Sequence, residues 1–256
     1  MSFVSPNSAG EVQARHARVE LLAQQTALLP GQENLLGVHF SLEKGWHIYW
    51  TNPGDSGQPP AFQWQFPEGF SAGPVQWPRP EKLQNAHLAD YGYKDDVMLL
   101  VPVRAPAFYN RADAKLSLQA KWLICREVCI PDHAQLEITL AVNRPAIDQD
   151  HARLFAETRK LLPEPWPHAW KITAASEKDT FVLAIQNGRS ISHAEFFPLE
   201  PNQIENAAPQ PLKPTARGGN ITLKKSDQLL KPLSTLKGVL VLGERSYIVE
   251  APVTQR

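Results

Sequence analysis

Both cysteines of the 256-residue chain lie in one short stretch, Trp122-Leu123-Ile124-Cys125-Arg126-Glu127-Val128-Cys129-Ile130-Pro131. The residues on either side of the pair are mostly types that favour β-strands. We therefore predict a strand, a tight reversal at Arg126-Glu127 and a second strand. In such a hairpin Cys125 and Cys129 lie opposite each other at a distance that a disulfide can bridge.

The close spacing of the two cysteines favours a redox role but leaves other roles open. A disulfide that closes a five-residue ring stabilises the fold by only about 2 kcal/mol, and structural disulfides usually join distant segments, as between the sheets of a sandwich. A bond that can break without disturbing the fold suits a pair that cycles. An inert structural disulfide is the first alternative. A metal site is the second, although zinc needs about four ligands and only His133 is near.

The spacing of the pair differs from that of a thioredoxin site. Thioredoxin-like sites use C-x-x-C at the start of a helix, where the helix dipole lowers the pKa of the attacking thiol. Here three residues separate the cysteines, and Pro131 follows soon after. Within this stretch Arg126 would favour a thiolate and Glu127 would oppose it. We therefore expect access, rather than strong activation of a thiol, to govern reactivity.

The composition excludes several classes of partner. The 26 basic and 26 acidic residues give a net charge of zero, so nothing points to nucleic acid or to an anionic membrane surface. The longest apolar runs, such as residues 239–242, are far too short to cross a bilayer, and no membrane insertion is expected. Residues 1–4 show no secretory leader, which fits either a cytosolic protein or a secreted segment without its leader.

The 23 prolines and 14 glycines of the chain separate short segments of β-forming residues. This pattern predicts an all-β protein. Strands are expected at residues 35–42, 97–103, 115–122, 136–142, 181–185, 220–224, 238–242 and 247–253. Residues 148–162 instead predict a helix with Leu154, Phe155, Leu161 and Leu162 toward one side. The expected organisation is an N-terminal domain (1–147), a helical and Pro-rich connector (148–168) and a second β domain (169–256) with a long excursion at 198–219.

Aromatic residues concentrate in the N-terminal half, where core packing is the ordinary explanation and a docking or sugar-stacking face is the alternative. They are Trp46, Tyr49, Trp50, Trp64, Trp77, Tyr91, Tyr93 and Trp122. The segment at residues 45–60 (GWHIYWTNPGDSGQPP) predicts a strand that leads into a turn. Its length also allows a functional loop.

No motif for an organic cofactor or a resident metal is present. The eight histidines are scattered without metal-ligand spacing, and each is expected to be an ordinary surface or core residue. The chain lacks a nucleophile elbow, a phosphate-binding loop and a dinucleotide fingerprint. We therefore expect neither a cofactor nor a metal.

Three motifs in order carry a family resemblance: GWHIYWTNPGDSGQPP (45–60), ADYGYKDDVML (89–99) and WLICREVCIP (122–131). Together they resemble the periplasmic N-terminal region of the DsbD/ScsB family of transmembrane thiol:disulfide interchange proteins, closest to the ScsB (suppressor of copper sensitivity) branch. The resemblance covers about residues 15–145. The later part, including Glu195-Phe196-Phe197-Pro198, fits the second β domain of that branch with a weaker signal.

The resemblance implies two immunoglobulin-like β-sandwich domains and a periplasmic protein-disulfide reductase activity. Electrons would come from the transmembrane and thioredoxin-like domains of the same full-length protein and pass to thioredoxin-like periplasmic partners. Cys125 and Cys129 would be the catalytic redox pair, with Cys129 forming the mixed disulfide.

The resemblance also implies a cap loop, formed by Asp90, Tyr91, Gly92 and Tyr93, that shields the pair. The spacing departs from the DsbD branch, which has five residues between its cysteines. Two alternatives stay open: a β-sandwich module that binds protein or carbohydrate and has an inert disulfide, and a copper site made by Cys125, Cys129, Met98 and His133.

Overall fold

The computed structural model describes residues 10–85, 88–142 and 146–255, which form two compact units. The first consists of Met1–Ile48, Pro59–Pro78 and Tyr93–Lys160, and the second of Tyr49–Gln58, Arg79–Gly92 and Leu161–Arg256. The expected division into 1–147 and 169–256 is linear, whereas two segments of the N-terminal half pack with the second unit. Residues 1–4, where a leader was sought, lie outside the described part.

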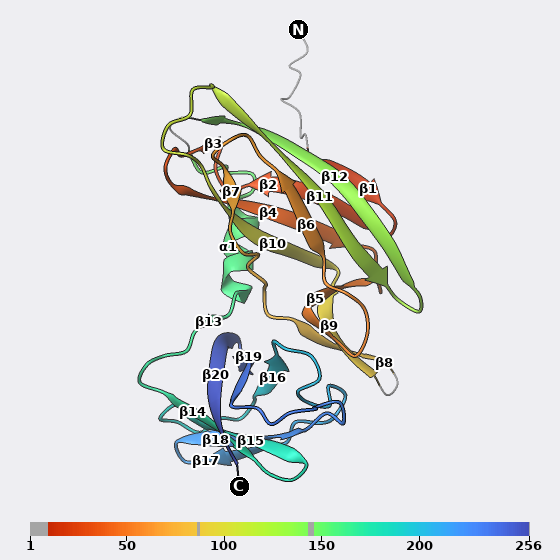
Figure 1. Cartoon of the computed structure of the whole chain (residues 1–256), viewed down its shortest axis with the longest axis vertical. Coiled ribbons are helices and arrows are strands. Elements are labelled where there is room, and N and C mark those ends of the chain that lie inside the picture. The colour runs from red at the N-terminus through yellow and green to blue at the C-terminus, as the bar shows by residue number, and fades with distance from the viewer. Residues whose placement is uncertain (1–9, 86–87, 143–145, 256) are drawn as a thin grey trace. The chain divides into compact units, whose positions relative to one another are not determined.

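The first unit is a two-sheet sandwich (Figure 1). One sheet has the order β1-β2-β4-β10-β7, and the other runs β3-β12-β11 and continues to β5, with β6 also paired to β11. The strands are β1 (Glu11–Ala14), β2 (Ala17–Ala23), β3 (Ala27–Leu28), β4 (Glu33–Leu42), β5 (His47–Gly54), β6 (Ala61–Gln65), β7 (Ser71–Ala72), β10 (Asp96–Arg104), β11 (Asp113–Cys125) and β12 (Cys129–Val142).

Strict alternation along the strands builds the core of the first unit. On β4, Leu36, Val38 and Phe40 are fully buried, as expected for residues two apart that share one face. Alternate residues of β11, such as Leu118, are fully buried as well. The rings of Phe40 and Trp122 meet edge to face with centroids 5.3 Å apart, which joins the two sheets through the core.

Helix α1 (Ala152–Leu161) covers the opposite face of β4 and β10. Phe155 is fully buried, and its ring lies close to Gly37, where an added Cβ would come within 3.3 Å of the ring and 2.3 Å of the Met98 sulfur. The buried residues of the helix are Phe155 and Thr158, whereas Leu161 is 44% exposed. The prediction that Leu161 faces inward was wrong, because the helix packs around Phe155 over a glycine.

A histidine links three strands on the same face of the first sheet. His39 of β4 is buried, with Nδ1 3.1 Å from Glu20 Oε2 on β2 and Nε2 2.7 Å from Asp96 Oδ2 on β10. A neutral imidazole has only one N–H to donate, so two carboxylate partners favour the charged ring. Burial acts to lower the pKa of His39, but the hydrogen bonds and charges of Asp96 and Glu20 outweigh it and raise the pKa.

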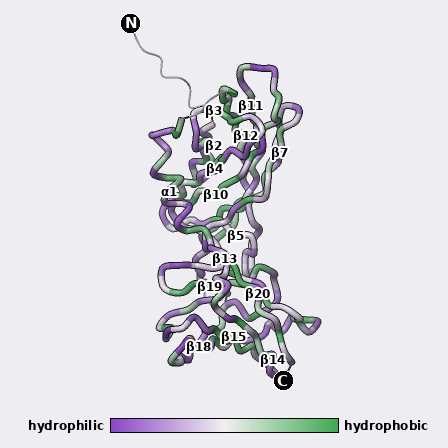
Figure 2. The backbone as a smooth tube through the Cα atoms, turned by 90° about the vertical axis from the view of Figure 1, so that its left-hand side faces the viewer, coloured by the Kyte–Doolittle hydropathy of each residue, from purple (hydrophilic) through white to green (hydrophobic). Residues whose placement is uncertain are grey.

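The second unit is also built of strands, and Figure 2 shows hydrophobic and hydrophilic segments alternating along its backbone. Its sheet order is β16-β19-β20-β14-β15-β18-β17, with β13 on β20, and within the unit β5 pairs with β9 and β9 with β8. The strands are β8 (Glu81–Asn85), β9 (Leu88–Lys94), β13 (Glu164–Pro165), β14 (Lys171–Ser176), β15 (Thr180–Gln186), β16 (Glu195–Pro198), β17 (Leu212–Thr215), β18 (Gly218–Lys224), β19 (Thr235–Leu242) and β20 (Arg245–Gln255).

The predicted all-β class with immunoglobulin-like sandwiches is confirmed. All eight predicted strand segments lie within observed strands, and the predicted helix is present. The stretch at 198–219 is less irregular than expected, because β17 forms inside it and pairs with β18. Fully buried Phe181, Leu183, Phe196 and Leu240 form part of the core of this unit.

Candidate functional site: a disulfide at a hairpin tip

The two cysteines close the tip of the long β11–β12 hairpin. The antiparallel register runs without interruption from Asp113↔Ala141 to Cys125↔Cys129. Arg126 N–H donates to the Val128 carbonyl at 3.2 Å and so closes the turn. A disulfide joins Cys125 and Cys129, whose Cα atoms are 4.2 Å apart. The prediction that the pair lies on adjacent strands at bridging distance is confirmed.

The two cysteines differ in exposure. Cys125 is 2% exposed, whereas Cys129 is exposed and follows Val128, which is 63% exposed. The difference follows from their places, since Cys125 ends a core strand and Cys129 begins the outer strand of the hairpin. An incoming thiolate must approach along the line of the S–S bond, so access to each sulfur bears on which one a partner can attack.

Non-covalent contacts hold the hairpin turn from one side. The ring of His16 stacks on Trp46 with centroids 3.8 Å apart, and the Arg126 guanidinium carbon lies 5.8 Å from the centre of the Trp46 ring. His16 Nδ1 is 2.7 Å from Glu43 Oε2. The Arg126–Glu127 ion pair is 4.0 Å long and exposed, so it adds little stability. Stacking on the buried Trp46 is therefore the main non-covalent anchor of the turn.

His47 stands directly opposite Cys125 on the other side of β11. The two residues are Cα partners of the antiparallel β5–β11 pair, so His47, Cys125 and Cys129 form one row across three strands. His47 is half-buried. The scattered spacing of the histidines along the chain does not single out His47. Its position in the first family motif, GWHIYW, was the available signal.

The structure corrects the secondary structure expected for the cap. Asp90, Tyr91, Gly92 and Tyr93 were predicted to form a loop, but they lie in strand β9 and are buried. The Asp90 carboxylate accepts hydrogen bonds from the Ser56 backbone N–H at 2.9 Å and from its hydroxyl at 3.0 Å. Strand formation satisfies the backbone of this segment, which a polar aromatic sequence alone did not indicate.

The two tyrosines of this segment have buried hydrogen-bond partners. The Tyr91 hydroxyl donates to Asn206 Oδ1 at 2.9 Å, and its ring packs edge to face on Phe197 at 5.2 Å. The Tyr93 hydroxyl donates to the Pro78 carbonyl at 2.7 Å. Burial raises the pKa of both hydroxyls, so both stay protonated. Whether the segment also shields the disulfide stays a prediction.

The Asn-Pro-Gly-Asp-Ser-Gly part of the first motif forms a hydrogen-bonded turn of the second unit. Asp55 accepts from the Ala89 N–H at 2.7 Å and from Asn206 Nδ2 at 2.8 Å. Gly57 has a φ of +79°, and an added Cβ there would lie 2.1 Å from the Tyr49 ring. These contacts give the turn a structural role in its own unit.

Most of the concentrated aromatics are core residues. Trp64 and Trp77 are half-buried. The other six are each at most 8% exposed: Trp46, Tyr49, Trp50, Tyr91, Tyr93 and Trp122. A sugar-stacking platform needs exposed ring faces, and these six do not supply them. Core packing therefore explains the concentration.

The four proposed copper ligands do not converge. His133 pairs with Lys121, four register steps from the cysteine pair, or about 13 Å along the hairpin. Met98 is buried, with its sulfur beside Gly37. Within the described ranges, no group of three or more His, Cys, Asp or Glu side chains is placed to hold a metal ion. Nor does any helix among those residues have the length and apolarity needed to cross a membrane.

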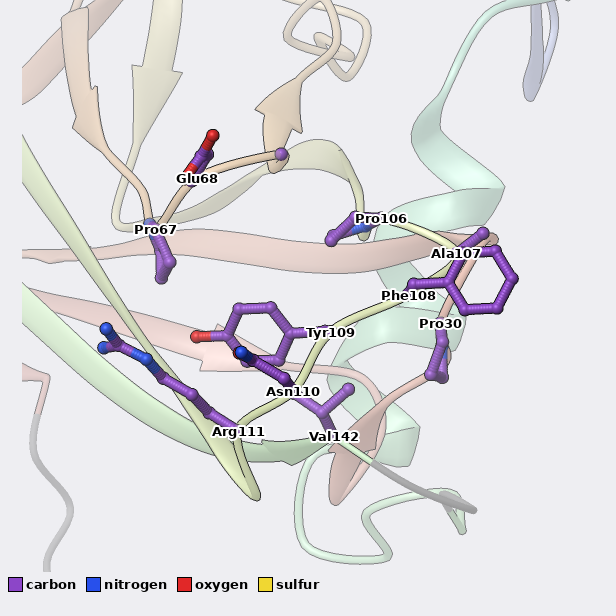
Figure 3. Close-up of a pocket in the computed structure, with 11 residues that line it drawn as sticks. Pro30, Pro67, Glu68, Pro106, Ala107, Phe108, Tyr109, Asn110, Arg111 and Val142 are labelled. Carbon is purple, nitrogen blue, oxygen red and sulfur yellow. The ribbon is translucent and has the colours of Figure 1, made fainter.

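A hollow of about 940 Å³ lies at the other end of the β11–β12 hairpin. Figure 3 shows Tyr109, Asn110 and Arg111 side by side on the segment that leads into β11, with Val142 at the end of β12. The cysteine pair is twelve register steps away, or about 40 Å along the strands. The hollow is therefore separate from the disulfide site.

Fold and site together define an all-β domain that presents a disulfide at the tip of a hairpin. Residues 18–141 match the family model described as thiol:disulfide interchange protein DsbD, N-terminal. The resemblance carried by the three motifs is confirmed. Together with the Cys125–Cys129 disulfide, the match supports a thiol:disulfide interchange domain in this chain.

A solved structure resembles nearly the whole chain. It is the crystal structure of the N-terminal periplasmic domain of ScsB from Proteus mirabilis, with a TM-score of 0.74 and 17% sequence identity over 98% of this chain and 100% of that one. At this identity the likeness shows the fold alone. It extends beyond residues 18–141 into the second unit. A search of curated proteins found no match.

Proposed function

We propose that this chain is a periplasmic protein-disulfide reductase domain that relays electrons by disulfide exchange. Electrons would arrive from the membrane-embedded and thioredoxin-like domains of the same full-length protein and leave to thioredoxin-like periplasmic proteins. The observation that carries the proposal is the disulfide at the hairpin tip, with Cys129 exposed and Cys125 buried. The match of residues 18–141 to the DsbD N-terminal family model supports it.

Delivery of electrons takes two exchange steps in this proposal. The Cys129 thiolate attacks one sulfur of an oxidised partner, the partner's S–S bond breaks and its second sulfur leaves as a thiolate. The Cys125 thiolate then attacks the Cys129 sulfur, which re-forms the Cys125–Cys129 bond and releases the partner as a dithiol. Two electrons pass to the partner, and the domain ends oxidised. Recharging runs the same steps in reverse with an upstream dithiol.

The surroundings of the pair favour control by access. Arg126 favours a thiolate nearby, while the exposed Glu127 opposes it at 4.0 Å from the guanidinium. Exposed charges act weakly on a neighbouring pKa because water screens them. Val128 presents an exposed apolar side chain beside Cys129 that a partner can cover on docking. A partner with its own low-pKa thiol would supply the reactivity that this site lacks.

A trapping experiment tests which sulfur meets the partner. Cys125→Ser leaves Cys129 able to attack oxidised thioredoxin but removes the thiol that would resolve the product. We expect a mixed disulfide on a non-reducing gel with Cys125→Ser and much less with Cys129→Ser. The Cys125→Ser/Cys129→Ser double variant has no thiol and is the negative control, which should form no mixed disulfide. Equal trapping by both single variants would refute the assignment of Cys129.

The midpoint potential of the pair separates the relay from an inert disulfide. Thioredoxin has a potential of about −270 mV, and structural disulfides of secreted proteins typically lie below about −300 mV. A value in the thioredoxin range or above it supports the relay. A value well below about −300 mV would favour the alternative, a β-sandwich binding module with an inert disulfide.

A further inference from the structure

The disulfide site contains an ionisable side chain that the exchange steps above do not use. His47 is the Cα partner of Cys125, and Cys125 is the Cα partner of Cys129. Residues directly opposite each other on neighbouring strands project to the same face of a sheet, with Cβ atoms about 4.5–5.5 Å apart. The imidazole and the Cys125 sulfur therefore project side by side, within reach of each other.

Cys125 needs a proton acceptor because of where it lies. It must be a thiolate to attack Cys129, yet an ordinary thiol has a pKa of about 8.5, and apolar burial raises the pKa of a thiol further. At 2% exposure its sulfur exchanges protons poorly with water. An imidazole has an ordinary pKa of about 6.5, which suits transfer near neutral pH. The half-buried His47 stands next to Cys125 in the row across the three strands.

We propose that His47 is the proton-transfer residue of the Cys125–Cys129 pair. This role rests on the proposed function, since it concerns the same exchange site. When the pair is oxidised by a partner, the neutral imidazole takes the proton of the Cys125 thiol. Cys125 then attacks the Cys129 sulfur, the mixed disulfide breaks and the partner leaves as a thiolate. The imidazolium gives its proton to that thiolate or to water.

The same residue serves the reverse direction. An upstream thiolate attacks the exposed Cys129 sulfur, the Cys125–Cys129 bond breaks and Cys125 leaves as a thiolate. His47 in its charged form donates a proton to that leaving group, so no buried anion persists. Stabilisation of the leaving thiolate is where a general acid helps disulfide exchange, because a better leaving group leaves faster.

Other ionisable groups of the first unit lie near the row in the fold and define the controls. His16 stacks on Trp46, the residue before His47. The turn before β5 and the hairpin turn supply charges, and the end of β9, the next strand of the sheet, adds a phenol and an amine. These groups are Glu43, Lys44, Arg126, Glu127, Tyr93 and Lys94.

The test is the pH dependence of reduction of the oxidised 256-residue chain by dithiothreitol. Rates are expressed per dithiothreitol thiolate from pH 5 to 9 and read by thiol labelling after an acid quench. For the unaltered chain we expect one inflection in the imidazole range, with faster reduction on its acid side. His47→Gln should lose the inflection and react about a hundredfold more slowly at pH 6, the low end of general acid catalysis.

Two histidine variants serve as matched controls. His16→Gln removes the stacked ring beside the turn, and His133→Gln removes a histidine four register steps along the same hairpin. Both should keep the inflection. If His47→Gln keeps it, or slows the reaction equally at every pH, the proposal is overturned and His47 is a structural residue. Thermal unfolding of each variant confirms that it is folded.

The dithiothreitol assay needs no protein partner, so its result is independent of the relay. Loss of the inflection in His47→Gln together with no trapping of thioredoxin would remove the relay and keep the proton-transfer role. Trapping through Cys129 together with an unchanged pH profile in His47→Gln would support the relay and remove the proton-transfer role of His47.

Discussion

Reduction of the disulfide should weaken the first unit only slightly. The closed ring runs from Cys125 to Cys129, a sequence separation of 4, and therefore contains five residues. The chain-entropy relation gives about 7 cal/mol/K for a ring of this size, or about 2 kcal/mol at 25 °C. The unbroken pairing of β11 with β12 remains when the S–S bond is gone. Reduction should therefore lower the free energy of unfolding by about 2 kcal/mol and leave the fold intact.

Urea unfolding of the oxidised and reduced protein measures this loss. With a urea slope of about 2 kcal/mol/M, the midpoint of the first unit should fall by about 1 M on reduction. The two units are expected to unfold in separate transitions, so each is followed by hydrogen exchange at assigned amides as well as by circular dichroism. The Cys125→Ser/Cys129→Ser variant should match the reduced protein and should not respond to dithiothreitol.

Two outcomes would refute this reasoning. A reduced protein whose first unit is unfolded, or weaker by more than about 5 kcal/mol, would mean that the bond is a structural staple, since losses of this size follow removal of structural disulfides. A midpoint that does not change at all would mean that closing this small ring does not restrict the unfolded chain measurably. Then the chain-entropy estimate would not apply to this ring.

Two further predictions concern pH and the cap. Because its carboxylate partners raise the pKa of His39 above 6.5, its contribution to stability is full below that value and is lost as pH rises through the raised pKa. Urea midpoints should therefore fall with pH over this window in the unaltered protein but not in His39→Gln; parallel curves would contradict this. If the segment Asp90–Tyr93 shields the pair, the double variant Tyr91→Ala/Tyr93→Ala should react faster with iodoacetamide when reduced. Tyr109→Ala is the control, and an unchanged rate in a folded double variant would end the cap hypothesis.

The strands of the sandwich were predictable where local pattern decides them. Alternating apolar residues mark β4 and β11, and a continuous apolar run marks β10 because α1 covers its second face. The face of α1 was not predictable from its own residues. Phe155 is buried because Gly37, 118 positions earlier, leaves room for its ring. Sequence pattern does not report which glycine a helix will meet.

The hairpin that carries the two cysteines could be predicted from the sequence, whereas the structure of the residues around it could not. The β-forming flanks of the cysteines and the short reversal gave the hairpin and the bridge. The cap segment resembled a loop because Asp and Gly are common in turns. It forms a strand since its side chains find partners far along the chain, such as Asn206 for Tyr91. Likewise, only the β5–β11 register places His47 opposite Cys125.

The position of the disulfide explains why opening this bond is expected to leave the fold intact. Strand β11 is held by β12 along its whole length and by β6 and β5 on its other edge. The turn is held by stacking of Arg126 on Trp46. These contacts keep the two strands in register up to the Cys125–Cys129 pair, so we expect the reduced thiols to stay close together. Exchange then needs only a thiolate, a proton acceptor and an open approach to Cys129, and the fold supplies a half-buried imidazole and an exposed sulfur at the same tip.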